Sequence, residues 1–369
     1  MPKANETVLE INLSALGDNF QYIKSKTSKV TKILGVVKAF AYGSDAVEIA
    51  KELVDLGVNY LAVAYVKEGV ALRDAGIKTP IIVLHPQAVN FETLIDRCLE
   101  PNLYSPNILK HFIAVASNQN QRNYPVHLKF NTGLNRLGFW KNDVDFIVSE
   151  ISDTNSILVK SVFSHLAASE DETEREFSKK QINSFNKITE KLFEKLNYTP
   201  WKHMCNTSGI FNYPEAHFDM VRTGIGLYGF GNSEKENKSL TPIATLKSVI
   251  SQIHSVDKGE SVGYNRAFKS EALLKTATIP IGHADGISRA YGNGKGWVYV
   301  NHQKAPIIGN VCMDMIMINV TNIDCIEGDE VILFGEINRA DNLTEENNSI
   351  SYELITAISQ RVKRIIIRR

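Results

Sequence analysis

The sequence predicts an α/β fold, a (β/α)8 TIM-type barrel followed by a C-terminal domain made mainly of β-strands. Apolar runs of strand length alternate with amphipathic helical patterns in the first part of the chain, and eight such runs can be counted, as a closed barrel requires. Beyond a polar, charged stretch at residues 231–238, apolar residues recur with a period of two and turn signals such as Asn293-Gly294 appear. A doubly wound open sheet is the competing architecture.

The length of 369 residues favours two domains. We predict a barrel domain at residues 10–235 and a β-rich domain at residues 236–369. The N-terminal strand (residues 1–9) is expected to be part of the β-rich domain. The expected barrel strands are residues 33–39, 60–66, 80–85, 101–104, 126–131, 159–165, 203–206 and 221–228. The expected helices of this part are residues 14–25, 45–56, 67–75, 91–99, 106–117, 142–151 and 174–196.

Outside the barrel, the pattern of apolar residues predicts strands at residues 8–13, 244–256, 275–281, 296–300, 305–308, 315–320, 330–334 and 364–369. A helix is expected at residues 351–361. Ser44 and Asp45 stand where the N-cap of helix 45–56 belongs.

The composition and charge of the chain argue against several classes of function. The net charge is zero at pH 7, which gives no support to a nucleic-acid or acidic-membrane partner. No apolar run approaches the roughly 20 residues of a membrane span, and the first residues lack the layout of a signal peptide. The four cysteines form no CxxC pair, so neither a metal site nor a disulfide framework is indicated. We expect a cytoplasmic protein.

A lysine, Lys38, stands at the expected end of the first barrel strand. Surroundings that desolvate an amine lower its pKa and make it a nucleophile that can form an imine with a carbonyl cofactor. On this segment alone, a solvated lysine is the simpler interpretation. In a barrel, however, the C-terminal ends of the strands carry the active site. Polar side chains lie at or near four other expected strands' C-terminal ends, namely Lys129, Asn131, Arg136, His165, Asn206, Ser208 and Arg222.

Two loops suit a phosphate group. Ser208-Gly209 and the segment at residues 223–226 (TGIG) follow the last two barrel strands, where backbone N–H groups of small residues often bind phosphate. Glycines that serve tight turns explain either loop alone equally well. A lysine for an imine and a phosphate cradle together point to pyridoxal phosphate (PLP). Arg222 would donate to the ring nitrogen, which weakens the cofactor as an electron sink and favours proton exchange at Cα over transamination.

Short motifs occur in order along the chain. They are VKAFAYG (37–43), KFNTGLNRLGF (129–139), FSHL (163–166), NTSG (206–209), VRTGIGLYG (221–229), VGY (262–264), IPIGHADG (279–286), GNVCMD (309–314) and YEL (352–354). Together they resemble the ordered motifs of the alanine racemase family, over nearly the whole chain. The resemblance implies a PLP-binding barrel, a C-terminal β-domain and a head-to-tail homodimer in which one subunit's β-domain closes the other's site.

Site roles follow from the resemblance, position by position. Lys38 would hold the cofactor and act as the base on the D-face, and Tyr264 of the partner subunit would take the Cα proton of the L-substrate. His165 would help Tyr264, whose unperturbed pKa near 10 makes it a poor base by itself, and would contact Arg222. The residues that would hold the phosphate are Tyr42, Ser208, Gly224, Ile225 and Tyr352. The residues that would contact or help to position the substrate are Arg136, Met313 and Asp314, Arg136 also contacting the cofactor's phenolic oxygen.

Five positions depart from the family pattern or suggest modification. Lys129 matches a lysine that many members carry as a carbamate, and Asn131 stands where Asp is usual. An unmodified Lys129 close to Arg136 would be repelled, which makes carbamylation or a bound anion a hypothesis. His283 replaces the usual tyrosine of the inner gate of the substrate channel, so entry could be looser or dependent on pH. Asn310 replaces an Arg, and Phe40 replaces an Asn.

The expected function is interconversion of L-alanine and D-alanine by two bases, supplying D-alanine for peptidoglycan. A racemase for serine or other amino acids is the alternative in the same class. A non-catalytic PLP-binding protein on the same barrel would lack the β-domain, so Tyr264 and Met313-Asp314 argue against it. PLP decarboxylases would pair the ring nitrogen with a carboxylate, whereas this chain offers Arg222.

Overall fold

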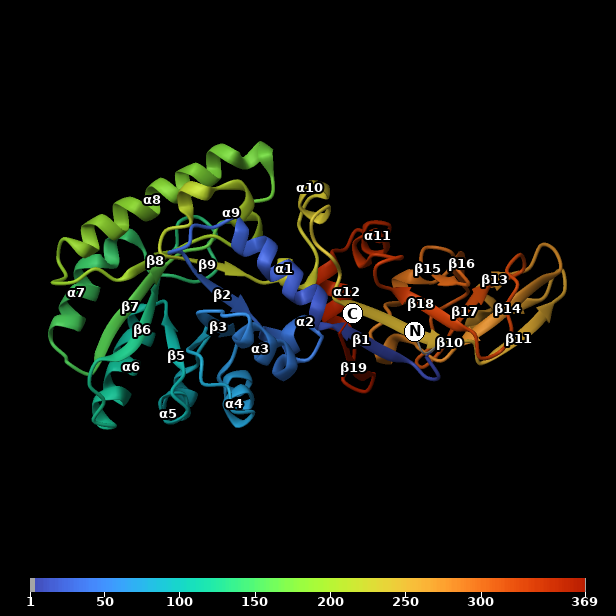
Figure 1. Ribbon diagram of the computed structural model, residues 1–369, viewed down its shortest axis with the longest axis horizontal. Coiled ribbons are helices and arrows are strands. Elements are labelled where there is room, and N and C mark those ends of the chain that lie inside the picture. The colour runs from blue at the N-terminus through green and yellow to red at the C-terminus, as the bar shows by residue number, and fades with distance from the viewer. Residues whose placement is uncertain (1–3, 369) are drawn as a thin grey trace.

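A closed barrel and a large mixed sheet lie end to end in the computed structural model, which describes residues 4–368 (Figure 1). Eight parallel strands form the barrel, in the order β2 to β9, and β2 pairs with both β3 and β9 to close it. The (β/α)8 prediction is therefore confirmed, and the open sheet is excluded. The strands are β2 (Lys32–Val36), β3 (Tyr60–Val63), β4 (Ile81–Val83), β5 (Glu100–Leu103), β6 (Tyr124–Lys129), β7 (Ile157–Phe163), β8 (Trp201–His203) and β9 (Met220–Thr223).

Helices cover the outside of the barrel (Figure 1). They are α1 (Leu13–Ser25), α3 (Ala46–Asp55), α4 (Val66–Asp74), α5 (Phe91–Asp96), α6 (Pro106–Asn118), α7 (Val144–Ser152), α8 (Arg175–Phe193) and α9 (Thr207–Asn212). Asp45 caps α3 as expected, because its carboxylate accepts the N–H groups of Val47 and Glu48, both at 3.0 Å. Asn12 caps α1 in the same way, through Ser14 and Ala15.

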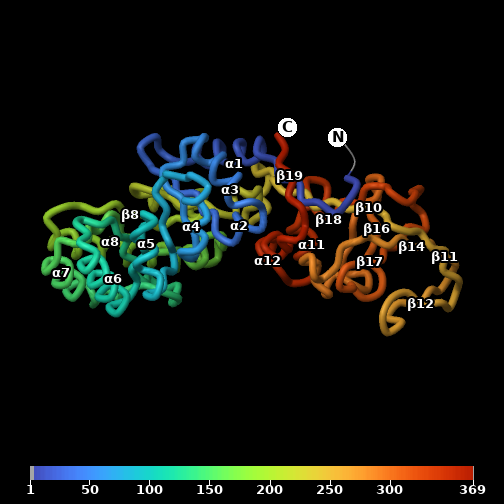
Figure 2. The backbone as a smooth tube through the Cα atoms, turned by 90° about the horizontal axis from the view of Figure 1, so that it is seen from below, coloured from blue at the N-terminus to red at the C-terminus, as the bar shows by residue number. Residues whose placement is uncertain are grey.

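The part of the chain outside the barrel forms a nine-stranded sheet in the order β11-β14-β17-β16-β15-β18-β10-β1-β19. Its strands are β1 (Val8–Asn12), β10 (Ala244–Val249), β11 (Gln252–Val256), β14 (Leu274–Ile279), β15 (Trp297–Val300), β16 (Gln303–Ile308), β17 (Ile316–Asn319), β18 (Glu330–Phe334) and β19 (Lys363–Ile367). The N-terminal strand β1 lies antiparallel to β10 and parallel to β19, so the first and last described segments meet in one sheet. A short hairpin, β12 (Ser261–Val262) with β13 (Phe268–Lys269), lies at the end of the molecule away from the barrel (Figure 2).

Several predicted boundaries are wrong, for identifiable reasons. Predicted strand 33–39 ends at Val36, because the chain turns left-handed after Lys38. Predicted strand 221–228 ends at Thr223 and continues as the 3-10 helix η5 (Ile225–Tyr228). Predicted strand 244–256 is two strands, because Ile250 bonds to Asp329 while the next residue bonds to Thr278, in a different part of the sheet. Predicted helix 351–361 is α12 (Ser351–Ala357), and it ends where Ile358 becomes extended.

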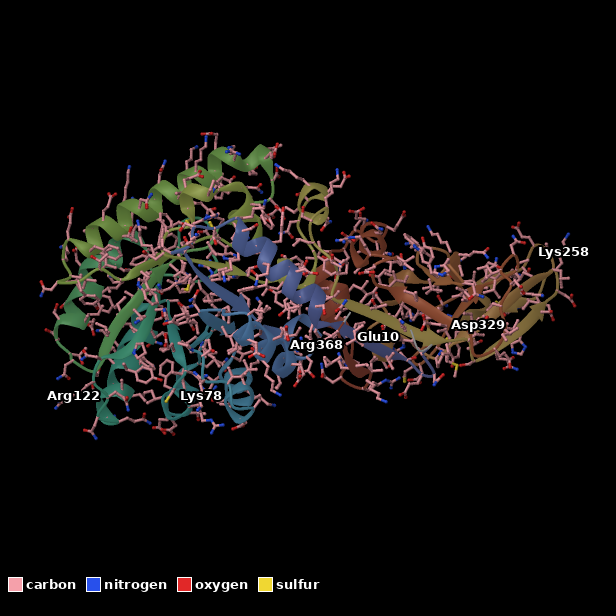
Figure 3. The ribbon with its side chains drawn as sticks, viewed as in Figure 1. Glu10, Lys78, Arg122, Lys258, Asp329 and Arg368 are labelled. Atoms are coloured by element: carbon pink, nitrogen blue, oxygen red, sulfur yellow. The ribbon has the colours of Figure 1, made fainter. Side chains whose placement is uncertain are left out.

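Besides α9, two further short helices, α10 (Glu234–Asn237) and α11 (Ala340–Glu345), were not expected. Together with α12 they lie between the barrel and the sheet (Figure 1). Among residues 4–368, no helix is long and apolar enough to cross a membrane. Charged side chains extend outward from the surface, with Arg122 and Lys258 near the two ends of the molecule and Lys78 on the lower side of the barrel part (Figure 3).

The junction between barrel and sheet centres on Gly43. Its φ is +81°, and an added Cβ would collide with the carbonyl oxygen of Ile355 in α12. Arg364 of β19 donates to the carbonyls of Gly43 (2.9 Å) and Ser44 (3.2 Å), and to that of Ile358 (2.9 Å). The segment after β2 is therefore held from the sheet side of the molecule as well as from the barrel.

Gly43→Ala should destabilise the fold by about 3 kcal/mol or more, because it adds a steric clash to the cost of a left-handed L-residue. Gly57→Ala is the matched control, since Gly57 has a φ of +86° and an added Cβ there meets nothing within 4 Å. It should cost only about 1–2 kcal/mol, the conformational part of the effect. Urea unfolding measures both, and equal losses would show that the packing against α12 contributes nothing.

Candidate active site

Lys38 begins a single left-handed helical turn, α2 (Lys38–Tyr42), directly after β2. Ala39, Phe40, Ala41 and Tyr42 have φ values between +52° and +54°. Each such L-residue costs on the order of 1–2 kcal/mol, so this conformation requires support from its surroundings. The turn places the Lys38 side chain at the C-terminal mouth of the barrel, where barrel active sites lie.

The support comes mainly from Glu68 and Tyr228. One carboxylate oxygen of Glu68 accepts the N–H of Ala39 at 2.6 Å, and the other accepts those of Ala64 (2.7 Å) and Tyr65 (3.0 Å). Glu68 thus ties the turn to the start of α4. The ring of Tyr42 stacks on that of Tyr228, with centroids 4.5 Å apart. Neither Glu68 nor Tyr228 was predicted as a site residue, because both act through contacts distant in sequence.

A cavity of about 700 Å³ opens at this mouth, large enough for a cofactor and a small substrate. Four cationic side chains line it, namely Lys38, Lys129, Arg136 and Arg222. No carboxylate stands among its described lining residues. Such an excess of positive charge in a concave site favours a ligand with several negative charges.

The two lysines have lowered pKa values. Burial, followed by the charge of Arg136, lowers the pKa of Lys38. Burial lowers the pKa of Lys129 to about 8, with further contributions from Arg136, Arg222 and Lys38. About a tenth of Lys129 is therefore a neutral, nucleophilic amine at pH 7, far more than for an ordinary lysine, and the pKa of Lys38 is shifted in the same direction. The expectation of a desolvated amine at Lys38 agrees with this geometry.

Arg222 lies deep in the cavity and is only 5% exposed. It donates to the carbonyls of Ser164 (2.7 Å) and Met204 (3.0 Å), and it contacts Nδ1 of His203 (2.7 Å) and of His165 (3.0 Å). Burial lowers its pKa to about 10, which leaves it protonated at neutral pH. Burial and the nearby cations lower the pKa of His165 well below its ordinary value, so the ring is neutral.

Four of the five predicted phosphate-binding residues line the cavity, and Ser208 does not. Tyr42, Gly224, Ile225 and Tyr352 line the cavity with Lys38. A Cβ on Gly224 would collide with the Tyr42 hydroxyl, so this loop requires a glycine. The Ser208 side chain is directed elsewhere. It is fully buried, its hydroxyl donates to Glu236 at 3.0 Å, and Asn232 donates to it at 2.8 Å.

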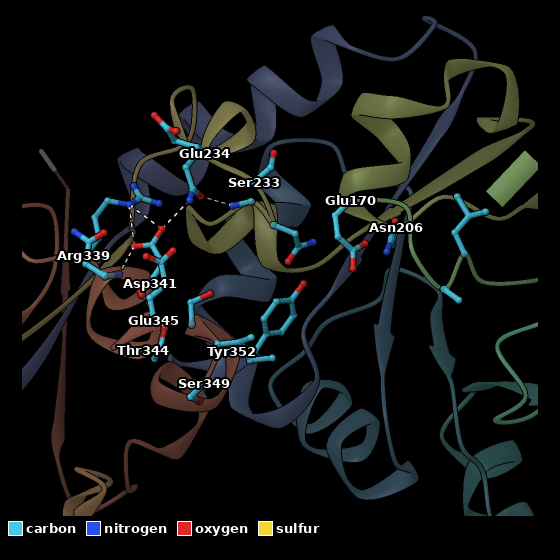
Figure 4. A pocket seen from close by; sticks show the side chains of 18 of the residues that line it. Glu170, Asn206, Ser233, Glu234, Arg339, Asp341, Thr344, Glu345, Ser349 and Tyr352 are labelled. Atoms are coloured by element: carbon cyan, nitrogen blue, oxygen red, sulfur yellow. Dashed lines mark hydrogen bonds and ion pairs between the residues drawn. The ribbon is translucent and has the colours of Figure 1, made fainter. Parts of the chain in front are cut away.

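A second cavity of about 990 Å³ adjoins the first and shares Arg136, His165, Asn206 and Tyr352 with it. Tyr352 of α12 lies between α11 and the barrel residues Asn206 and Glu170 (Figure 4). On the far side, Asp341 pairs with Arg339 and accepts a hydrogen bond from Asn237, which links α11 to α10. Because Tyr352 lines both cavities, this helix of the C-terminal part shapes the entrance to the barrel site.

The remaining predicted residues lie in the sheet part and do not line the barrel cavity. Tyr264 is 72% exposed and Met313 is 60% exposed. Asn310 donates to the carbonyl of Tyr264 at 3.1 Å. The backbone N–H of His283 donates to Cys312 at 2.9 Å, next to Met313. Asp314 pairs with Arg361.

The loop that presents Arg136 is organised by Asn131. Its side-chain oxygen accepts the N–H groups of Gly133 (3.1 Å) and Asn135 (3.0 Å), as an aspartate would. The departure at Asn131 therefore preserves the local turn. His203 was placed on a strand but not assigned a role. A histidine on the strand that precedes the strand of Arg222 could have been identified as its neighbour, because consecutive strands of a barrel are adjacent.

The cavity fits PLP. An amine with a lowered pKa is available for attachment at Lys38, and Arg222 is a buried donor for a ring nitrogen. The glycine at position 224 leaves room beside Tyr42 for a phosphate. The four cations match the phosphate, the phenolic oxygen and a substrate carboxylate.

Two family models match the chain, the alanine racemase N-terminal domain over residues 11–231 and the alanine racemase C-terminal domain over residues 243–366. The alanine racemase of Clostridium novyi (strain NT) is 38% identical over 371 residues, which cover 97% of this chain and 95% of that protein. The structure of alanine racemase from Clostridium difficile 630 has a TM-score of 0.93 and 34% identity, covering 99% and 97% of the two chains.

Alanine racemase from Bartonella henselae, solved with covalently bound pyridoxal phosphate, has a TM-score of 0.88 and 28% identity. The match covers 99% of this chain and 100% of that one. The two domain models together span the barrel and the sheet, and the relatives match from end to end. The chain therefore belongs to the alanine racemase family.

Proposed function

We propose that this protein interconverts L-alanine and D-alanine, using PLP bound at the mouth of the barrel. The observation that carries the proposal is a cavity with an amine of lowered pKa, a buried guanidinium and four cations without a carboxylate. The full-length relatives named alanine racemase favour alanine over the serine alternative. D-alanine made in this way would serve peptidoglycan synthesis, and a cytoplasmic location stays a prediction.

Lys38 would attach PLP, while Tyr42, Gly224, Ile225 and Tyr352 would surround its phosphate. When bound, PLP makes the Cα proton of an amino acid acidic by withdrawing electrons through its ring. Arg222 stays protonated and can only donate to the ring nitrogen, which limits that withdrawal and favours return of the proton to Cα. Ser208 could join the phosphate site only by exchanging its bond to Glu236.

Racemisation requires a proton to leave one face of Cα and return to the other. We assign Nζ of Lys38 to the D-face and the phenolic oxygen of Tyr264 of the partner subunit to the L-face. The lowered pKa of Lys38 makes its amine available as a base. Neutral His165 accepts from Arg222 at Nδ1 and therefore carries its proton on Nε2, from which it would donate to the phenolic oxygen of Tyr264 and stabilise that oxygen in its anionic, basic form.

A homodimer would bring the two halves of the site together. Tyr264 and Met313 are exposed on the sheet part, and Phe40 (57% exposed) and Tyr65 (52% exposed) are exposed beside the cavity. Burial of such side chains against a second subunit would stabilise the assembly. The barrel domain (10–235) would receive the partner's β-domain (236–369 with 1–9). Met313 would offer its N–H to the substrate carboxylate, Asp314 would help to position these groups, and His283 would line the entrance.

A stereochemical assay tests the two-base assignment. With PLP and L-alanine in D2O, the protein should produce equal amounts of both enantiomers, since these have equal free energies, with deuterium at Cα. Tyr264→Phe should slow exchange of L-alanine by about 100-fold or more, the usual contribution of a positioned base. Tyr299→Phe, on the sheet strand β15, is the control. Chiral chromatography with mass spectrometry measures both, and unchanged exchange in Tyr264→Phe would exclude the role.

Mixed dimers test the shared site. Lys38→Ala and Tyr264→Phe homodimers should each be nearly inactive, because every site lacks one base. Mixing the two after subunit exchange should restore up to about a quarter of the wild-type activity, because half of the dimers are then mixed and one of their two sites is intact. Absence of recovery, with exchange verified by differently tagged subunits, would contradict a site built from two chains.

Lys129 is the candidate for carbamylation. Its pKa of about 8 leaves a neutral amine that can react with CO2, and the resulting anion would relieve repulsion among the four cations. With 13C-bicarbonate, NMR should show a carbamate signal that Lys129→Ala abolishes. Arg136→Met should weaken the signal, because it raises the pKa of Lys129 and removes the anion's partner. A spectrum without the signal, with PLP bound, would contradict the modification.

A further inference from the structure

A chain of buried hydrogen bonds leaves the cavity and crosses the inside of the barrel. Nη1 of Arg222 lies 2.7 Å from Nδ1 of His203, and Nε2 of His203 lies 2.8 Å from Oγ of Ser161. The same hydroxyl lies 2.7 Å from Nδ1 of His127, whose Nε2 lies 2.7 Å from a carboxylate oxygen of Glu100. The chain uses one residue from each of five adjacent strands, β9, β8, β7, β6 and β5.

This path is unusual because barrel interiors are mostly filled with branched apolar side chains. His127 and Ser161 are fully buried and His203 is 1% exposed, while the Glu100 side chain is 12% exposed at the other end. Buried polar groups cost free energy unless they are hydrogen-bonded. Every link of this chain is satisfied by the next, and the chain ends at an acidic side chain.

The position of each proton follows from Arg222. A guanidinium can only donate, so Nδ1 of His203 must accept. Burial and the charge of Arg222 lower the pKa of His203 well below its ordinary value, so the ring is neutral and its proton sits on Nε2. That N–H donates to Ser161, the hydroxyl of Ser161 donates to Nδ1 of His127, and Nε2–H of His127 donates to Glu100. All four bonds then run in one direction, from cation to anion.

We propose that Glu100, His127 and Ser161 are positioning residues for Arg222. Their relay holds His203 as the neutral Nε2–H tautomer, so that Nδ1 stays available to the guanidinium. The guanidinium is thereby kept aimed at the place where Arg222 would meet the cofactor's ring nitrogen. The effect on catalysis rests on the proposed function, whereas the proton positions do not.

Nitrogen NMR of the holoenzyme with ring-15N histidine tests the relay directly. The signals of His127 and His203 are identified by their loss in His127→Gln and His203→Gln. Both rings should be neutral with the proton on Nε2. A proton on Nδ1 of His203, or a His127 ring protonated on both nitrogens, would overturn the proposal. In the second case Ser161 would accept from both rings and the direction would be broken at its hydroxyl.

Two substitutions separate the hydroxyl link from the charge. Ser161→Ala removes the group that accepts Nε2–H of His203 and donates to His127, so the 15N signals of both rings should shift and the His203 ring should hold Arg222 less firmly. The absorbance maximum of the bound cofactor should shift, and kcat should fall about 10-fold with KM changed less than about two-fold, a loss typical of outer hydrogen-bond partners. Glu100→Gln keeps an acceptor oxygen without the charge, so His127 and His203 should each keep the proton on Nε2. Its kcat should fall less than that of Ser161→Ala.

Ser248→Ala is the matched control. Ser248 is fully buried on β10 in the sheet part, and its hydroxyl is bonded to that of Thr7 at 2.7 Å, far from the relay. It should leave the histidine signals and the cofactor absorbance unchanged. If Ser161→Ala behaves like Ser248→Ala, the relay has no positioning role. If Ser161→Ala does not fold, the tautomers of His127 and His203 in the unsubstituted protein still decide whether the relay exists. Correct tautomers without alanine racemisation would overturn the proposed function and leave the relay intact.

Discussion

The left-handed turn after β2 is the constraint on which the site depends. Ala39 to Tyr42 adopt a conformation that costs each L-residue on the order of 1–2 kcal/mol, and the rest of the fold must hold it in place. Glu68 in α4 accepts the N–H of Ala39, and Tyr228 stacks on the ring of Tyr42. Arg364 of β19 donates to the carbonyls of Gly43 and Ser44, which follow the turn. Because these supports come from the barrel and from the sheet, neither part alone accounts for the position of Lys38.

Charge is the second organising feature. Lys38, Lys129, Arg136 and Arg222 converge on one cavity without a lining carboxylate, so the protein contains mutual repulsion that an anionic ligand relieves. The same repulsion, added to burial, lowers the pKa values of both lysines. A cofactor phosphate and a substrate carboxylate would therefore be bound by the field that prepares Lys38 as a base. The relay from Arg222 to Glu100 extends this arrangement through the barrel interior, where an anion is available only at the far end.

The elongated shape of the subunit places Tyr264 away from its own barrel cavity. The hairpin β12–β13 and the η6 turn (Tyr264–Arg266) that it carries lie at the end away from the barrel (Figure 2). Tyr264 and Met313 are both exposed on the sheet part, although both are apolar over much of their surface. In the proposed dimer each subunit offers a cavity at one end and covers its partner's cavity with the other. The acid–base pair would then form only on association, which couples activity to assembly.

Local patterns in the sequence determined the alternation of strands and helices, the Asp45 cap, the lysine and arginine at strand ends, and the glycine loops. These features depend on periodicity, capping and side-chain size, which act over a few residues. Tertiary structure alone decided that four non-glycine residues turn left-handed after Lys38, because their propensities oppose it and distant contacts from Glu68 and Tyr228 outweigh them. It also directed Ser208 toward Glu236 and joined His203 to Glu100 through neighbouring strands. Such pairings link residues far apart in the chain, and only the closed barrel brings them within hydrogen-bond distance.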